Sequence, residues 1–341
     1  MNLSKISTMK NINQANKVYI PIRFYKEIKL HIFKNYYANK YHEFETPLIL
    51  AISGPPGVGK TYQVEKTLEE MGIEKFNISG TEFENEHAGV PVKNILKIYK
   101  NMAEDIYFKK IKYGVIIIND IDAALGSWGG LVQYTMNRQL IIKALIDLAD
   151  NPYELKISDE DGHMQHYDMC RIPLIITLND ETKMYEPLMR NGRTKVFPWL
   201  PNEEEVSYIL TNIFRNIEFI DANGFCIPVF ELYRQLLKYV SNLMGENINV
   251  LPISIFSDIK SSLIDNLLWD ELCKNDSLDM IAEKLRRKLD IRQKYTFSEA
   301  LTVGQNLLHQ NNNYLRDEYS GVAKPPVRSI ESQCSDGTEP L

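Results

Sequence analysis

The chain has 341 residues, of which 44% are hydrophobic and 25% charged, and its formal net charge is -6. This balance is typical of a globular protein with one or two ordinary cores, and the acidic excess argues against a broad nucleic-acid surface. No apolar run approaches the roughly 20 residues of a membrane span, and the cysteines lack the spacing of a zinc site or a disulfide framework. We therefore expect a cytoplasmic protein that contacts neither a membrane nor nucleic acid.

The predicted elements alternate between short apolar strands and longer helical segments over the first part of the chain. Residues 1–17 are polar without periodicity, which predicts a flexible leader. Buried strands are predicted at residues 47–52, 76–78, 115–118, 172–178 and 196–199, and helices at residues 24–37, 60–71, 91–110 and 131–149. The alternation predicts an α/β domain over residues 18–200, with a parallel five-stranded sheet that helices cover on both faces.

After Pro201 the pattern changes to helices only. They are predicted at residues 203–216, 228–243, 251–269, 278–289 and 297–316. We expect an all-helical second domain over residues 201–319. The remaining residues, 320–341, are rich in Ser, Pro, Gly and charge, which predicts a flexible tail.

A glycine-rich segment joins the first predicted strand to the helix at residues 60–71. It consists of Gly54, Pro55, Pro56, Gly57, Val58, Gly59, Lys60 and Thr61. In such a P-loop, glycines let the backbone N–H groups and the helix N-terminus surround phosphate groups. The lysine contacts the β- and γ-phosphates, and the hydroxyl binds Mg²⁺. The segment therefore predicts a site for ATP with Mg²⁺.

Polar residues follow two further predicted strands. Asn119, Asp120 and Asp122 follow the strand at residues 115–118, and Asn179 ends the next strand. The carboxyl ends of parallel strands are where α/β sheets bind ligands. Because Asn119 carries no charge, we expect Asp120, together with Asp122, to supply the carboxylates that bind Mg²⁺ and orient the attacking water. Asn179 is expected to sense the γ-phosphate; helix capping and an ordinary turn are the alternatives.

Two arginines, Arg190 and Arg193, lie three residues apart after a short predicted helix. An arginine that one subunit delivers to a neighbour's γ-phosphate stabilises charge in the transition state. We expect this catalytic role for both residues. Ordinary solvated arginines are the alternative.

These elements, in this order, resemble those of the AAA+ ATPases, and among them the Rubisco activase family. The run from Asn119 to Ala123 has that family's unusual asparagine, and its Gln-Tyr-Thr-x-Asn pattern recurs from Gln133 to Asn137. The similarity covers about residues 18–320. One departure is the P-loop, which has the general AAA+ sequence instead of the more basic, proline-free loop of the activases.

The resemblance implies a chaperone that forms a hexameric ring and uses ATP to pull on the large subunit of Rubisco, releasing inhibitory sugar phosphates. Lys60, Thr61, Asp120 and Asn179 would act within one subunit, while the two arginines would reach the next. Three aromatic residues would lie on loops that grip the target in the central pore, namely Phe83, Trp128 and Tyr134. Lys260 falls near the family's second sensor arginine.

Three other functions remain open at this point. The chain could be a remodeller of the same build with a different protein target. It could be a DNA-associated loader, against which the acidic composition argues. It could also be a scaffold that binds ATP with little turnover, which only the uncharged Asn119 suggests.

Overall fold

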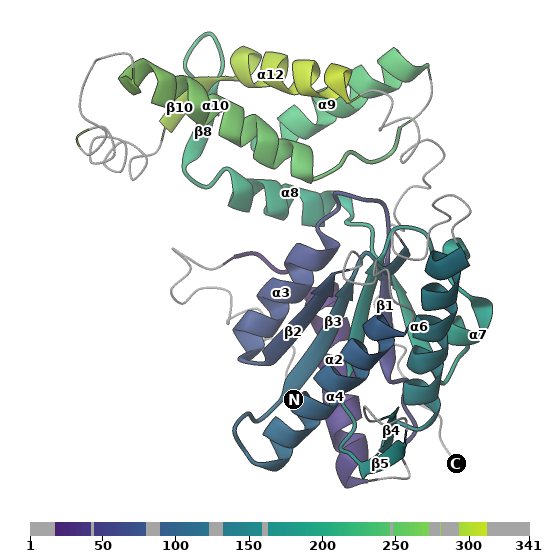
Figure 1. Ribbon diagram of the computed structural model, residues 1–341. Coiled ribbons are helices and arrows are strands. Elements are labelled where there is room, and N and C mark those ends of the chain that lie inside the picture. Colours follow the sequence, from purple (N-terminus) through teal and green to yellow (C-terminus); the bar gives the residue numbers. More distant parts are fainter. Residues whose placement is uncertain are drawn as a thin grey trace, which may run out of the picture.

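The computed structural model describes residues 18–41, 44–79, 89–122, 132–158, 163–245, 248–272, 280 and 293–311. Within these residues, an α/β unit is followed by a mainly helical unit that lies beyond one end of the sheet (Figure 1). The expected fold class is confirmed. The predicted domain limits stay predictions, and the leader, the tail and most of the helix predicted at residues 278–289 lie outside the described residues.

The α/β unit is built on a parallel sheet of five strands in the order β2-β3-β6-β1-β7. The strands are β1 (Ile49–Ser53), β2 (Glu74–Ser79), β3 (Gly114–Asn119), β6 (Leu174–Leu178) and β7 (Thr194–Pro198). β1 pairs with β6 on one side and with β7 on the other. The glycine-rich segment therefore leaves the sheet beside the ends of β6 and β7.

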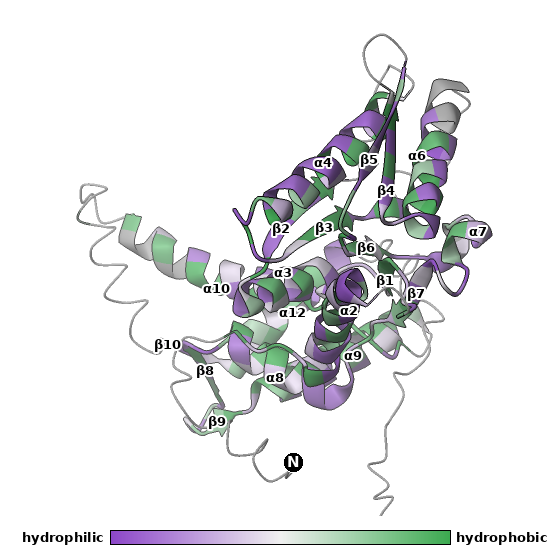
Figure 2. Cartoon of the chain, turned by 90° about the horizontal axis from the view of Figure 1, so that it is seen from below, coloured by the Kyte–Doolittle hydropathy of each residue, from purple (hydrophilic) through white to green (hydrophobic). Residues whose placement is uncertain are grey.

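Helices cover both faces of the sheet (Figure 2): α2 and α3 lie on one face, and α4 and α6 lie on the other. Their bounds are Ile22–Lys40, Lys60–Met71, Val90–Tyr107 and Val132–Asp150. Ile49 and Ala51 of β1 join the core with α4 and α6, whereas Leu50 and Ile52 join the core with α2 and α3. Because alternate side chains point to opposite covered faces, the strand is apolar without a break from Ile49 to Ile52.

The C-terminal unit has a separate core formed by α8, α9, α10 and α12. These helices span Glu203–Ile213, Val229–Met244, Ser254–Leu272 and Phe297–Gln310. This unit also contains a three-stranded sheet in the order β10-β8-β9, with bounds Gln293–Thr296, Ile217–Ile220 and Cys226–Ile227. The sequence did not predict this sheet, nor the hairpin of β4 (Glu154–Ser158) and β5 (Met164–Asp168). The unit is therefore mainly helical, with a small sheet added.

A buried polar network fixes α2 to the amino-terminal edge of the sheet. Arg171 Nε donates to Asn35 Oδ1 (2.6 Å), Asn35 Nδ2 donates to Pro47 O (3.1 Å), and His31 Nε2 donates to Leu174 O (3.1 Å). Burial lowers the pKa of His31 to about 3, so its ring is neutral at ordinary pH. These contacts give His31 and Asn35 a structural role. No described helix has the length and apolarity to cross a membrane.

Candidate functional site

The glycine-rich segment forms the turn between β1 and α3. Gly57 and Gly59 have φ angles of 78° and 84°, in the left-handed region that favours glycine. Helix α3 begins without a side-chain cap and has no acidic residue in its first turn. Its first N–H groups and the positive end of its dipole therefore face the loop, as a phosphate ligand requires.

Trp199, which follows β7, packs against this loop and is hydrogen-bonded to it. It is fully buried, its backbone N–H donates to Ser53 O (2.6 Å), and its indole Nε1 donates to Val58 O (3.1 Å). A Cβ atom added at Gly54 would lie 2.1 Å from Trp199 O. The loop can therefore adopt this path only with glycine at position 54.

Replacing Gly54 by alanine is expected to displace the loop, lower the melting temperature and weaken ATP binding. The reason is that the clash involves backbone atoms, which cannot rotate away. Calorimetric titration with ATP and a thermal melt measure both effects. Gly224→Ala is the control for ATP binding: its φ of 84° makes alanine strained there, so the melting temperature should also fall, but the turn is remote from the loop and the affinity for ATP should not change. An affinity for ATP equal to that of the wild type would contradict the prediction.

Lys60 begins α3, and its buried ammonium group lies within the loop. It donates to Gly54 O (2.7 Å), Pro55 O (3.0 Å) and Asn179 Oδ1 (2.7 Å). The last contact joins the P-loop to the residue that follows β6. The structure thus brings Lys60 and Asn179 together, as the proposed sensing of a γ-phosphate by Asn179 requires.

The end of β3 is tied to β6 through Thr177, a fully buried residue that the sequence analysis did not single out. Its Oγ1 accepts a hydrogen bond from Asp120 N (3.0 Å) and donates to Asn119 Oδ1 (3.5 Å). Asp120 has a φ angle of 49°, which is uncommon outside glycine and occurs at constrained sites. The side chain of Asp120 is therefore held at the same sheet edge as the P-loop.

Asp122 is buried and contacts the backbone that follows β6. Its Oδ2 accepts from the backbone N–H groups of Asn179 (2.9 Å) and Asp180 (3.3 Å), while its Oδ1 is buried and has no hydrogen-bond partner within the described part of the chain. The carboxylate expected at the nucleotide is therefore directed to the turn after β6.

The donor set fits Mg²⁺. Oxygen ligands are what this ion prefers, and Asp120 is a solvent-accessible carboxylate at the sheet edge that carries the P-loop. Thr61 would add its hydroxyl from the first turn of α3. A bound Mg²⁺ would neutralise charge on the β- and γ-phosphates. The roles of these residues toward the metal stay predictions.

The pKa of Asp120 is raised by partial burial and by the nearby Asp122, and the ammonium group of Lys60 opposes this shift. A native pKa above the unfolded one means that protonation stabilises the fold, and that this stabilisation is lost as the pH rises through the native pKa. The ionised form of Asp120 therefore opposes folding.

Asp120→Asn is accordingly expected to reduce ATP turnover without lowering the melting temperature at neutral pH. Turnover assays and melts over a range of pH measure both effects. Any gain in stability of the variant over the wild type should shrink as the pH falls through the native pKa of Asp120 and vanish below the lower pKa of the unfolded chain. Asp105→Asn, which removes an exposed carboxylate paired with Lys110, is the control. A clear loss of stability at neutral pH would contradict this account of Asp120.

The two arginines follow α7 (Glu186–Met189), at the amino-terminal end of β7. Arg193 forms a two-pronged ion pair with Asp150 at the end of α6, with distances of 2.6 and 2.7 Å, and donates to Pro187 O (2.6 Å). The side chain of Arg190 is exposed, and no hydrogen bond or ion pair holds it within the described part of the chain. The two arginines, which the sequence presents as equivalent, therefore differ in the structure: the side chain of Arg193 is held by an ion pair, and that of Arg190 is exposed.

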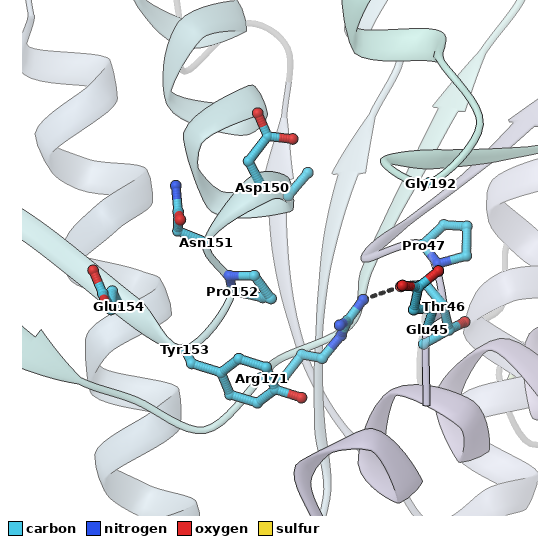
Figure 3. Close-up of a pocket in the computed structure, with 11 residues that line it drawn as sticks. Glu45, Thr46, Pro47, Asp150, Asn151, Pro152, Tyr153, Glu154, Arg171 and Gly192 are labelled. Carbon is cyan, nitrogen blue, oxygen red and sulfur yellow. Dashed lines mark hydrogen bonds between the residues drawn. The ribbon is translucent and has the colours of Figure 1, made fainter. Parts of the chain in front are cut away.

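A pocket at this edge of the sheet borders the arginine segment (Figure 3). Its wall includes Asp150, Glu154, Arg171 and Gly192, and the guanidinium of Arg171 points toward the carbonyl of Thr46. None of the predicted nucleotide-binding residues lines it. This pocket lies at the amino-terminal ends of the strands, whereas the P-loop follows the carboxyl end of β1.

The remaining predicted positions are less informative. Phe83 and Trp128 lie outside the described residues, and of Tyr134 only the backbone, in the first turn of α6, is described. Lys260 Nζ donates to Ile213 O (2.6 Å) at the end of α8, and burial lowers its pKa. That contact gives Lys260 a role within the C-terminal unit.

A P-loop between a strand and a helix, with polar residues at the ends of the neighbouring strands, defines the site of a P-loop nucleoside triphosphatase. The family model of the "ATPase family associated with various cellular activities (AAA)" matches residues 50–202. Curated relatives narrow this further. The chain is 31% identical to ribulose bisphosphate carboxylase/oxygenase activase 1 of Nicotiana tabacum, over 89% of this chain and 64% of the relative.

Two other activases give similar values. Activase 2 of Larrea tridentata is 30% identical over 91% of this chain and 68% of the relative, and the activase of Arabidopsis thaliana is 36% identical over 89% and 60%. The chain therefore belongs to the Rubisco activase family of AAA ATPases. It spans a little less than two thirds of the length of the first of these relatives, at 64%.

The relatives correct one expectation. Their names all carry the word chloroplastic, so the expectation of a cytoplasmic protein is wrong. The absence of an obvious membrane or disulfide pattern does not distinguish the cytoplasm from a plastid interior. For this reason the composition led to a wrong prediction of localisation.

Proposed function

We propose that the protein is an ATP-driven remodelling chaperone that acts on Rubisco and releases inhibitory sugar phosphates by pulling on the large subunit. The observation that carries this proposal is family membership, with about 30% identity over 91% of the chain to a protein named Rubisco activase. The relatives also support a plastid as its place of action.

ATP and Mg²⁺ would bind at the carboxyl ends of the strands. The supporting features are the uncapped start of α3 and the contact of Lys60 with Asn179 (2.7 Å). In this arrangement Lys60 and Asn179 hold the γ-phosphate, and Asp120 orients the water that attacks it.

A ring of identical subunits, with six as the expected number, would complete this site. β1 and β7 are parallel, with Ile49 beside Thr194 and Ser53 beside Pro198. The P-loop follows one end of this pair, and Arg190 precedes the other, about 13 Å away along the strands. Arg190 therefore lies near the amino-terminal ends of these strands, opposite its own P-loop, which supports a role at the nucleotide of a neighbouring subunit.

The target is tested by adding the protein with ATP to Rubisco from the same source, locked by a tight-binding sugar phosphate. Recovery of carboxylation that requires ATP and is lost in Lys60→Ala is the expected result. Absence of recovery, with turnover of ATP intact, would instead favour a remodeller of the same build with another target. The general AAA+ form of the P-loop, with Pro55 and Pro56, is the observation behind that second candidate.

A further inference from the structure

The ends of β3 and β6 are joined by two sets of hydrogen bonds. Thr177 forms the first set, with Asp120 N and Asn119 Oδ1, and Asp122 forms the second, with the N–H groups of Asn179 and Asp180. β3 and β6 are adjacent and parallel, with Ile118 beside Ile176, so both strands end at this junction. The two sets fix Asp120 and Asn179 relative to each other.

Asp122 differs from Asp120 in what its oxygens can still contact. Its Oδ2 already accepts two backbone N–H groups, which occupy the acceptor sites of that oxygen. Its Oδ1 is buried and has no hydrogen-bond partner among the residues that the structure describes. Mg²⁺ usually keeps several of its waters, and a sealed oxygen leaves no room for them. The solvent-accessible Asp120 has no such restriction.

We infer that Asp122 is a positioning residue, which fixes the backbone of Asn179 so that its side chain meets Lys60 and the γ-phosphate, and that it does not bind Mg²⁺. This rests on the proposed function, because it assigns Asn179 to phosphate sensing. The contacts form a continuous chain from Asp122 through the Asn179 backbone and side chain to Lys60 Nζ. It replaces the expectation that Asp122 contributes directly to the nucleotide and metal site.

Two substitutions separate positioning from metal binding. Asp122→Ala removes both acceptors, whereas Asp122→Asn keeps one oxygen that can accept from Asn179 N. Positioning predicts that alanine lowers kcat at least about tenfold, as positioning residues do, and that asparagine restores much of it. The Mg²⁺ concentration for half-maximal turnover should stay near that of the wild type in both variants. A metal ligand would instead give a strongly raised Mg²⁺ requirement in both, without rescue by asparagine.

Binding measurements test the positioning role of Asp122 without relying on ATP turnover. Calorimetric titrations with ADP and with a non-hydrolysable ATP analogue should show that Asp122→Ala keeps its affinity for ADP and loses much of the preference for the triphosphate. Asn179→Ala should have the same effect, and the double variant should be no worse than either, since residues that act through one another are not additive. Additive effects would overturn the inference.

The controls keep each outcome interpretable. Asp105→Asn, at an exposed ion pair, should change nothing. If Asp122→Ala does not fold, Asp122→Asn and the Asn179 variants carry the comparison. If the wild type itself turns over no ATP, the proposed function fails, whereas the nucleotide preference of the Asp122 and Asn179 variants still decides the inference.

Discussion

Lys60→Ala is expected to reduce ATP turnover by about 100- to 1,000-fold, the usual loss when one preorganised donor to a developing charge is removed. The ammonium group is buried in the loop, 2.7 Å from both Gly54 O and Asn179 Oδ1. Alanine therefore removes the charge that would move to the γ-phosphate, and leaves Asn179 without its partner. A steady-state assay of phosphate release measures the effect.

Lys66→Ala is the matched control for this substitution. Lys66 lies on the same helix, its charge is also paired, with Glu69 at 2.7 Å, and its side chain faces solvent. Because such surface pairs contribute little, turnover and stability should both remain close to those of the wild type. Turnover that survives in Lys60→Ala would contradict the assignment of this site.

Arg190→Ala is expected to abolish turnover almost completely, by about a factor of 10³ or more, while ATP still binds. The exposed guanidinium has no partner within the described chain, so its removal leaves the fold intact. Arg193→Ala should differ, because it breaks a two-pronged ion pair with Asp150 and a hydrogen bond to Pro187 O, and should therefore lower the melting temperature. Turnover, calorimetric ATP binding and thermal melts distinguish the two variants.

Mixing the variants tests whether the arginine acts in a neighbouring subunit. Lys60→Ala and Arg190→Ala are each expected to be inactive alone. A mixed assembly pairs an intact P-loop from one subunit with an intact Arg190 from the next, so part of the turnover should return. Arg234→Ala, at an exposed pair with Glu231, is the control for loss of an arginine. No recovery on mixing, or full turnover in a monomer, would exclude action between subunits.

The sequence predicted the sheet and the P-loop well because their signals are local. The strand before Gly54 and the helix after Lys60 lie in one stretch of the chain, and α3 begins and ends where the pattern predicts. The small sheet of the C-terminal unit was missed for the opposite reason. β10 pairs with β8 across more than seventy residues, and each strand has only four. Such short segments carry no readable alternation.

The site shows the same division between local and long-range information. Motif spacing alone predicted that Lys60 and Asp120 belong to one site. It could not predict the contact of Asp122 with Asn179, because the two residues are far apart in the sequence and belong to no common motif. Likewise, only the fold reveals that Asp150 forms an ion pair with Arg193. Localisation was missed because composition does not encode it.

Trp199 gives the molecule a built-in optical reporter. The chain contains three tryptophans, and Trp269 is largely exposed while Trp199 is fully buried. The indole of Trp199 is bonded to the P-loop at Val58 O, and the guanidinium of Arg23 lies 4.4 Å from the ring centre. Arg23 also pairs with Glu205 at the start of α8. With Trp128→Phe and Trp269→Phe, intrinsic fluorescence would follow the loop and the first helix of the C-terminal unit together, without an added dye.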